Sequence, residues 1–113
     1  MGVLNAFQKV QSKLDTPIPL GYSSAGVVVE VGENVHEYRV GDRVACAGAG
    51  YANHADYVYV PRNLLALVPD GVSLEEASFA TVAAIALQGV RQTQPTLGER
   101  VAVLGLGLIG QIT

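Results

Sequence analysis

Short runs of β-branched and aromatic residues, separated by glycine and proline turns, dominate the chain between Tyr22 and Val68. Runs of this kind favour strands, because such side chains pack well on a pleated surface. We therefore predict strands at residues 22–31, 43–47, 51–60 and 64–68. Their close spacing favours a small barrel or sandwich.

The pattern changes at Ser73, where we predict that a helix begins. Ser73-Leu74-Glu75-Glu76 is a capping box, in which the serine hydroxyl and the Glu76 carboxylate each accept a backbone N–H of the other residue. An alanine- and leucine-rich run continues to about Arg91, and a linker follows at residues 92–98. Residues 1–15 have an apolar stripe at helical spacing, which predicts another helix packed on the strands. The stripe consists of Val3, Leu4, Phe7, Val10 and Leu14.

A nearly continuous apolar run at residues 100–104 is typical of a strand that is buried on both faces. It leads directly into Gly105-Leu-Gly107-Leu-Ile-Gly110, which has the G-x-G-x-x-G spacing of a dinucleotide-binding turn. In such a turn the glycines allow a tight bend, a close backbone approach to the pyrophosphate and close packing of helix on strand. The N-terminus of the following helix supplies N–H donors to the phosphates. The pattern therefore favours a dinucleotide site, with a plain strand-to-helix turn as the alternative.

Charge and hydropathy narrow the classes of partner. The formal net charge is −3 and lysines and arginines do not cluster, so we expect no nucleic-acid partner. The apolar stretches are far shorter than the ~20 residues that cross a bilayer, and the N-terminus lacks the pattern of a signal peptide. We therefore expect no membrane partner and a cytoplasmic location. The single cysteine, Cys46, excludes an internal disulfide.

Several segments occur in an order that is found in one known family. They are a strand at 19–32 that begins with Pro-Leu-Gly-Tyr-Ser, a Val-Gly-Asp-Arg-Val turn at 40–44, a tyrosine-containing strand that ends in Val-Pro at 51–61, a Val-Pro-Asp-Gly turn at 68–71, and a helix with Glu-Glu-Ala at 75–77. In this combination, followed by the glycine turn, the chain resembles the medium-chain dehydrogenase/reductase family of alcohol-dehydrogenase-like proteins. A Leu-Gln-Gly-Val-Arg stretch at 87–91 is similar to a bacterial subgroup of bi-domain oxidoreductases.

The resemblance implies a mainly β fold with flanking helices, of the α+β class. A partial GroES-like β-barrel would be followed by a helix and the first βα turn of a Rossmann fold. The corresponding parts are an N-terminal helix at 1–15, a barrel portion at 16–72, a connecting helix and linker at 73–98, and the start of a dinucleotide-binding domain at 99–113. The resemblance also implies that the chain is truncated at both ends.

The resemblance further implies where a metal would bind. Zinc-dependent members carry Gly-His-Glu where this chain has Gly21, Tyr22 and Ser23, and a Cys or Glu ligand where it has Ala80 or Thr81. A catalytic zinc needs three protein ligands, usually His, Cys or carboxylate. We therefore expect no zinc, and we treat Tyr22, Ser23 and Thr81 as candidate residues of a substrate pocket.

Other residues with reactive side chains have simpler interpretations. His36 and His54 could form a metal pair or an acid–base group, but no ligand partner stands at a suitable spacing, which favours solvated loops. Cys46 could be a nucleophile, but no base is near in sequence, which favours a small buried apolar residue. Three tyrosines are expected to pack the barrel with their hydroxyls at its edge: Tyr51, Tyr57 and Tyr59.

Two functions are compatible with these patterns. The first is a fragment of an NAD(P)-dependent, zinc-independent oxidoreductase, which transfers hydride to or from the carbonyl or alcohol carbon of a small-molecule substrate. In that case Gly105, Gly107 and Gly110 would bind NAD or NADP, and the 113-residue chain alone would be inactive. The second is a non-catalytic structural or oligomerisation module with a GroES-like fold. Unpaired strand edges favour a homodimer or a larger assembly in both cases.

Overall fold

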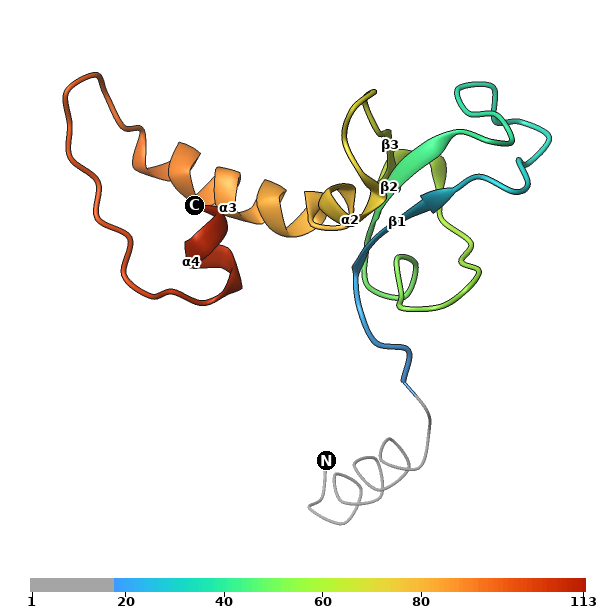
Figure 1. Cartoon of the computed structure of the whole chain (residues 1–113), viewed down its shortest axis with the longest axis horizontal. Helices are drawn as coiled ribbons and strands as arrows, with labels where there is room; N and C mark the ends of the chain where they lie inside the picture. Colours follow the sequence, from blue (N-terminus) through green and yellow to red (C-terminus); the bar gives the residue numbers. More distant parts are fainter. Residues whose placement is uncertain (1–17) are drawn as a thin grey trace, which may run out of the picture.

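A three-stranded antiparallel sheet forms the centre of the computed structural model, which describes residues 18–113. The strands are β1 (Ser23–Val27), β2 (Arg43–Ala47) and β3 (Leu65–Leu67), in the order β1-β2-β3 (Figure 1). The sheet is followed by helices, as expected for a partial GroES-like domain of the mainly β type. The helix expected at residues 1–15 lies outside the described residues.

The core forms beneath the central strand β2. Alternate side chains of β2 point inward, so that Val44 and Cys46 are buried while their neighbours are partly exposed. Ala52, which is fully buried, completes this cluster. Four partly buried side chains pack against it: Val28, Tyr38, Val60 and Leu65.

The strand predictions have different outcomes. The strand expected at 43–47 is confirmed, and those expected at 22–31 and 64–68 are present but shorter. The strand expected at 51–60 is wrong, because the chain turns back over Gly48, whose carbonyl accepts from the amides of Tyr51 and Ala52. Residues 57–60 belong to no strand and make no backbone hydrogen bond with the described residues.

The capping box at Ser73 is confirmed. The Ser73 hydroxyl accepts from the Glu76 amide at 3.1 Å, and the Ser73 amide donates to the Glu76 carboxylate at 2.8 Å. Two hydrogen bonds to the Glu76 carboxylate, from the Ser73 amide and from the Ser73 hydroxyl, lower the pKa of Glu76. The single helix expected from here to Arg91 is in fact two helices, α2 (Leu74–Ala77) and α3 (Ala80–Thr93), which contact β1 and β2.

The strand expected at residues 100–104 is absent. A parallel strand needs hydrogen-bonded neighbours, and no other strand of the described residues pairs with this segment. The chain instead makes a wide loop after α3 and returns in the short helix α4 (Leu108–Ile112), which packs against α3 (Figure 1). Among residues 18–113, no helix is long and apolar enough to cross a membrane.

Candidate functional site

Two of the three candidate pocket residues connect the sheet to the helices. The Ser23 hydroxyl donates to the Ser78 carbonyl at 2.5 Å, and the Thr81 hydroxyl donates to the Cys46 carbonyl at 3.2 Å. Ser23 pairs with Ala47 in the β1–β2 ladder, next to Cys46. The structure therefore places Ser23 and Thr81 at one corner, between the β1–β2 ladder and the start of α3, where both hydroxyls hold the helices on the sheet.

Tyr22 lies at the same corner, immediately before β1. Its side chain is 45 % exposed, and its carbonyl accepts from the Gly48 amide at 3.0 Å. Among the described residues, no side-chain hydrogen bond of its hydroxyl is present, in contrast to Ser23 and Thr81. The Tyr22 hydroxyl is thus the candidate group that can reach a bound molecule without breaking a contact of the fold.

His54 is brought to this corner by a loop that crosses over Gly21. The His54 amide donates to the Leu20 carbonyl at 2.8 Å, and an ideal Cβ on Gly21 would lie 2.6 Å from His54 Nε2. The imidazole therefore fills the space that any side chain at position 21 would need. The sequence interpretation of His54 as a loop residue missed this contact, since nothing in its spacing connects it with Gly21 or Tyr22.

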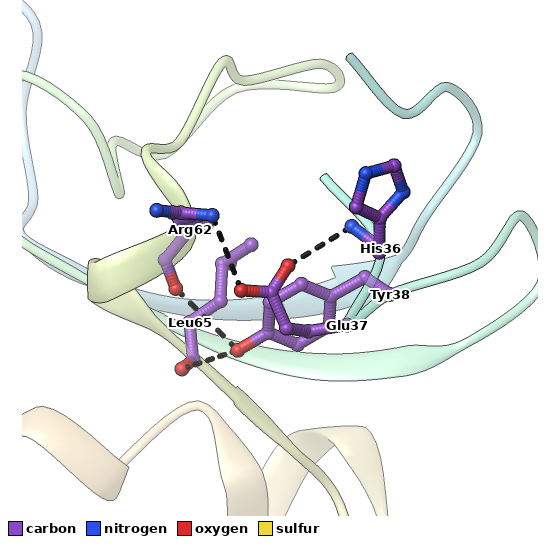
Figure 2. A network of polar contacts seen from close by, with 5 residues as sticks. All are labelled: His36, Glu37, Tyr38, Arg62 and Leu65. Atoms are coloured by element: carbon purple, nitrogen blue, oxygen red, sulfur yellow. Dashed lines mark hydrogen bonds and ion pairs between the residues drawn. The ribbon is translucent and has the colours of Figure 1, made fainter. Parts of the chain in front are cut away.

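The two histidines do not form a pair. His36 lies in the loop after β1, where its amide donates to the Glu37 carboxylate at 3.0 Å (Figure 2). Within residues 18–113, no group of three or more His, Cys, Asp or Glu side chains is arranged to hold a metal ion. Of the residues at the corner, Tyr22, Ser23 and Thr81 carry hydroxyl groups and His54 carries an imidazole.

A polar network between the loop after β1 and residues 62–65 fixes Tyr38. The Tyr38 hydroxyl donates to the Leu65 carbonyl at 2.8 Å, and Arg62 lies 3.3 Å from the Glu37 carboxylate (Figure 2). Hydrogen bonds from the backbone amides of Glu37 and His36 lower the pKa of Glu37, with a smaller contribution from Arg62. Because both charged side chains are exposed, their ion pair adds little stability. The hydrogen bond from the Tyr38 hydroxyl to Leu65 is the contact that holds the loop on β3.

The tyrosines expected to pack the barrel do not do so. Tyr57 and Tyr59 are 80 % and 85 % exposed, and Tyr51 is partly exposed with its ring against Gly48. That interpretation is therefore wrong, because without a strand at 51–60 these side chains are not directed inward. Cys46, in contrast, is buried, and burial raises the pKa of its thiol. This confirms its interpretation as a small core residue.

The glycine turn is a tight bend. Gly105 has φ +108°, in the region that favours glycine, and a Cβ on Gly110 would collide with the Gly105 carbonyl oxygen. Gly107 is different, because its φ is −74° and nothing lies within 4 Å of the position that a Cβ would occupy. Gly105 and Gly110 are thus needed by the turn itself, whereas Gly107 leaves an open space at the N-terminus of α4.

A cavity of about 300 Å³ opens beside β1. One wall is formed by β1 and the residues that follow it to Gly32, and the other by residues 55–62. Its base contains Cys46 and Ser24, whose hydroxyl is buried without a hydrogen-bond partner among the described residues. Tyr22, Ser23 and Thr81 do not line this cavity.

Comparisons with known proteins agree on one family. The family model of the alcohol dehydrogenase GroES-like domain matches residues 3–70. The chain is 34 % identical to (R,R)-butanediol dehydrogenase of Bacillus subtilis over 83 % of its own length, and 30 % identical to sorbitol dehydrogenase of Bombyx mori over 86 %. It is 36 % identical to D-guloside 3-dehydrogenase of Shigella flexneri over 82 %.

A solved structure gives the same result. The crystal structure of 2R,3R-butanediol dehydrogenase from Bacillus subtilis matches 85 % of the chain with a TM-score of 0.74 and 33 % identity. The match covers 34 % of the length of that protein. The sequence matches cover 34 % of (R,R)-butanediol dehydrogenase and 36 % of the Bombyx mori sorbitol dehydrogenase. For D-guloside 3-dehydrogenase the covered share is 26 %. The chain thus spans about a third of the length of the first relatives that it matches.

Proposed function

The chain belongs to the alcohol dehydrogenase GroES-like domain family, within the medium-chain dehydrogenases/reductases, and we propose that it is part of an NAD(P)-dependent oxidoreductase. In this proposal the sheet and helices up to Thr93 form part of one wall of the substrate cleft, and the glycine turn binds the pyrophosphate of the nucleotide. The single observation that carries the proposal is the open Gly107 in a turn that Gly105 and Gly110 already shape.

The residues of the turn fit a dinucleotide. The first amides of α4 have no partner within the helix, as at any helix N-terminus, and can donate to phosphate oxygens. The lack of a side chain at Gly107 lets the pyrophosphate approach these amides. When bound, the nicotinamide would supply or accept the hydride. The task of the chain is then to bind and orient the nucleotide and to hold the substrate oxygen.

We assign the substrate oxygen to the corner of Tyr22, Ser23 and Thr81. Relatives named as butanediol, sorbitol and guloside dehydrogenases support an alcohol or the corresponding carbonyl compound as substrate. Hydride transfer without zinc is the second part of the proposal, and it rests on the residue types at the corner, where Tyr22, Ser23 and Thr81 carry hydroxyl groups. Stoichiometric zinc in the purified enzyme, bound at this corner, would contradict that part of the proposal.

Nucleotide binding to the 113-residue chain tests the proposal directly. We expect saturable binding of NADH or NADPH with a Kd of about 1 mM, since one turn supplies only part of the contacts of a complete site. At ten times Kd the nucleotide should raise the free energy of unfolding by about 1.4 kcal/mol. Nicotinamide fluorescence and urea unfolding measure the two effects. A chain that binds neither nucleotide at millimolar concentration would favour the non-catalytic module instead.

Substitution of Tyr22 by phenylalanine tests the substrate corner in the complete dehydrogenase. We expect kcat/KM to fall about tenfold, because one hydrogen bond to the reacting oxygen is lost, while the free energy of unfolding stays unchanged. Tyr51→Phe is the matched control, since Tyr51 is exposed to a similar degree and is not one of the three candidate pocket residues. Equal kinetics for Tyr22→Phe and wild type would remove Tyr22 from the pocket.

A further inference from the structure

The backbone of His54 is fixed by two contacts that do not involve its side chain. Its amide donates to the Leu20 carbonyl at 2.8 Å, directly before Gly21 in the chain. Two residues before His54, Ala52 is fully buried in the core and anchors the same loop. A substitution of the imidazole therefore leaves both contacts in place.

The imidazole itself lies against the backbone directly before Tyr22. An ideal Cβ on Gly21 would lie 3.0 Å from His54 Cγ and 2.6 Å from His54 Nε2, so the ring occupies the place of a side chain at position 21. Gly21 also has φ +94°, which favours glycine. Glycine at this position thus lets the ring reach the residue that precedes Tyr22, one of the three residues to which we assign the substrate oxygen.

The chemistry at this oxygen requires a proton. A carbonyl carbon that receives a hydride leaves negative charge on its oxygen, and this oxygen must then be protonated. The hydroxyls of Ser23 and Thr81 already donate to carbonyls of the fold. Phenols and alcohols also keep their protons near neutral pH, whereas an imidazole takes up and releases a proton between pH 5 and 8. His54 therefore has the side chain at the corner that best suits an acid–base group.

The other titratable groups around the corner are phenols and carboxylates. They are Tyr22 before β1, Tyr51 and Asp56 on either side of His54 in the chain, and Glu75 and Glu76 on α2, whose C-cap Ser78 accepts from Ser23. Unperturbed phenols titrate above the range of an imidazole, and unperturbed carboxylates titrate below it. A titration at the corner between pH 5 and 8 is therefore expected from His54.

We propose that His54 is the acid–base residue of hydride transfer at this corner, an inference that rests on the proposed function. In reduction, the carbonyl carbon receives a hydride from NADH or NADPH, the C=O π bond breaks, and the imidazolium of His54 gives its proton to the oxygen. The products are the alcohol, NAD⁺ or NADP⁺ and a neutral imidazole. In oxidation, the neutral imidazole takes the proton of the hydroxyl group. Tyr22 donates a hydrogen bond to the same oxygen throughout.

Substitution of His54 by glutamine in the complete dehydrogenase tests this role. The probes are 2,3-butanediol, sorbitol and a guloside, the compounds in the names of the relatives, each with NAD⁺ and NADP⁺. We expect kcat to fall at least about a hundredfold, the usual size of an acid–base contribution, with KM changed less than about threefold. The affinity for NADH or NADPH, measured by nicotinamide fluorescence, should be unchanged because the glycine turn is untouched.

Two control variants separate proton transfer from packing. His54→Phe keeps a ring over Gly21 but cannot exchange a proton, so it should lose as much activity as His54→Gln while urea unfolding shows a folded protein. His36→Gln changes the second histidine, which lies in the loop after β1 (Figure 2), and should keep the kinetics of wild type.

The pH profile gives a measurement that a purely structural role would not change. In wild type, kcat/KM for alcohol oxidation should fall as the pH is lowered from 8 to 5, because an imidazolium cannot accept the proton. This fall should be absent from the residual activity of His54→Gln and His54→Phe. A loss of packing alone would lower the activity by the same factor at every pH.

The outcomes distinguish this role from the proposed function. If wild type oxidises none of the three compounds with either nucleotide, the proposed function is wrong and the role of His54 is wrong with it. If wild type is active and His54→Gln keeps its kcat or its fall in kcat/KM towards pH 5, only the role of His54 is wrong. The same holds if active wild type shows no such fall, a measurement that needs no variant.

Discussion

Replacement of Gly21 by alanine is expected to destabilise the chain by at least about 2 kcal/mol. Gly21 has φ +94°, which L side chains rarely adopt, and the His54 imidazole occupies the space that a Cβ would need. The substitution therefore strains the backbone and also displaces the loop that is fixed by the hydrogen bond from His54 to Leu20. Urea unfolding measures the effect as a lower midpoint with an unchanged slope.

Two further variants separate the causes of this loss. Gly26→Ala is the matched control. Gly26 lies in β1 without a positive φ, and nothing lies within 4 Å of the position that a Cβ would occupy. We therefore expect its free energy of unfolding to change by no more than about 0.5 kcal/mol. His54→Ala combined with Gly21→Ala should recover the part of the loss that is due to the collision, while the backbone strain remains. Equal stability of Gly21→Ala and Gly26→Ala would contradict the contact between Gly21 and His54.

Elements determined by local pattern could be predicted from the sequence. β2 has the predicted bounds, because alternation of buried and exposed residues between two turns specifies both its register and its inward face. The capping box at Ser73 needs only residues within one helical turn, and it is present as predicted. The bend of the glycine turn follows in the same way from Gly105 and Gly110, which are five residues apart.

Elements that depend on a distant partner could not be predicted. Residues 51–60 and 100–104 have strong β propensity, but propensity forms a strand only where another strand supplies hydrogen bonds. The exposed positions of Tyr57 and Tyr59 follow from the missing strand. At the candidate site, the contact of His54 with Gly21 joins residues 33 positions apart, and no local pattern encodes it.

Replacement of Gly107 by valine is expected to abolish nucleotide binding while leaving the fold intact. The φ of Gly107, −74°, suits any residue, and the space around it is open, so we expect a loss of less than about 1 kcal/mol in the free energy of unfolding. A valine side chain would fill the place where the pyrophosphate approaches the backbone. We expect the affinity for NADH or NADPH to fall at least tenfold, about 1.4 kcal/mol, by fluorescence titration.

Gly110→Ala is the comparison that separates loss of nucleotide binding from loss of stability in Gly107→Val. A methyl group on Gly110 would collide with the Gly105 carbonyl, so this variant should disturb the turn itself and lose stability together with binding. Loss of binding at Gly107 without loss of stability would show that the open space serves the ligand, because no contact within the fold depends on it. Unchanged affinity in Gly107→Val would mean that the turn only connects residues 100–104 to α4, and the non-catalytic module would then be the better account of this chain.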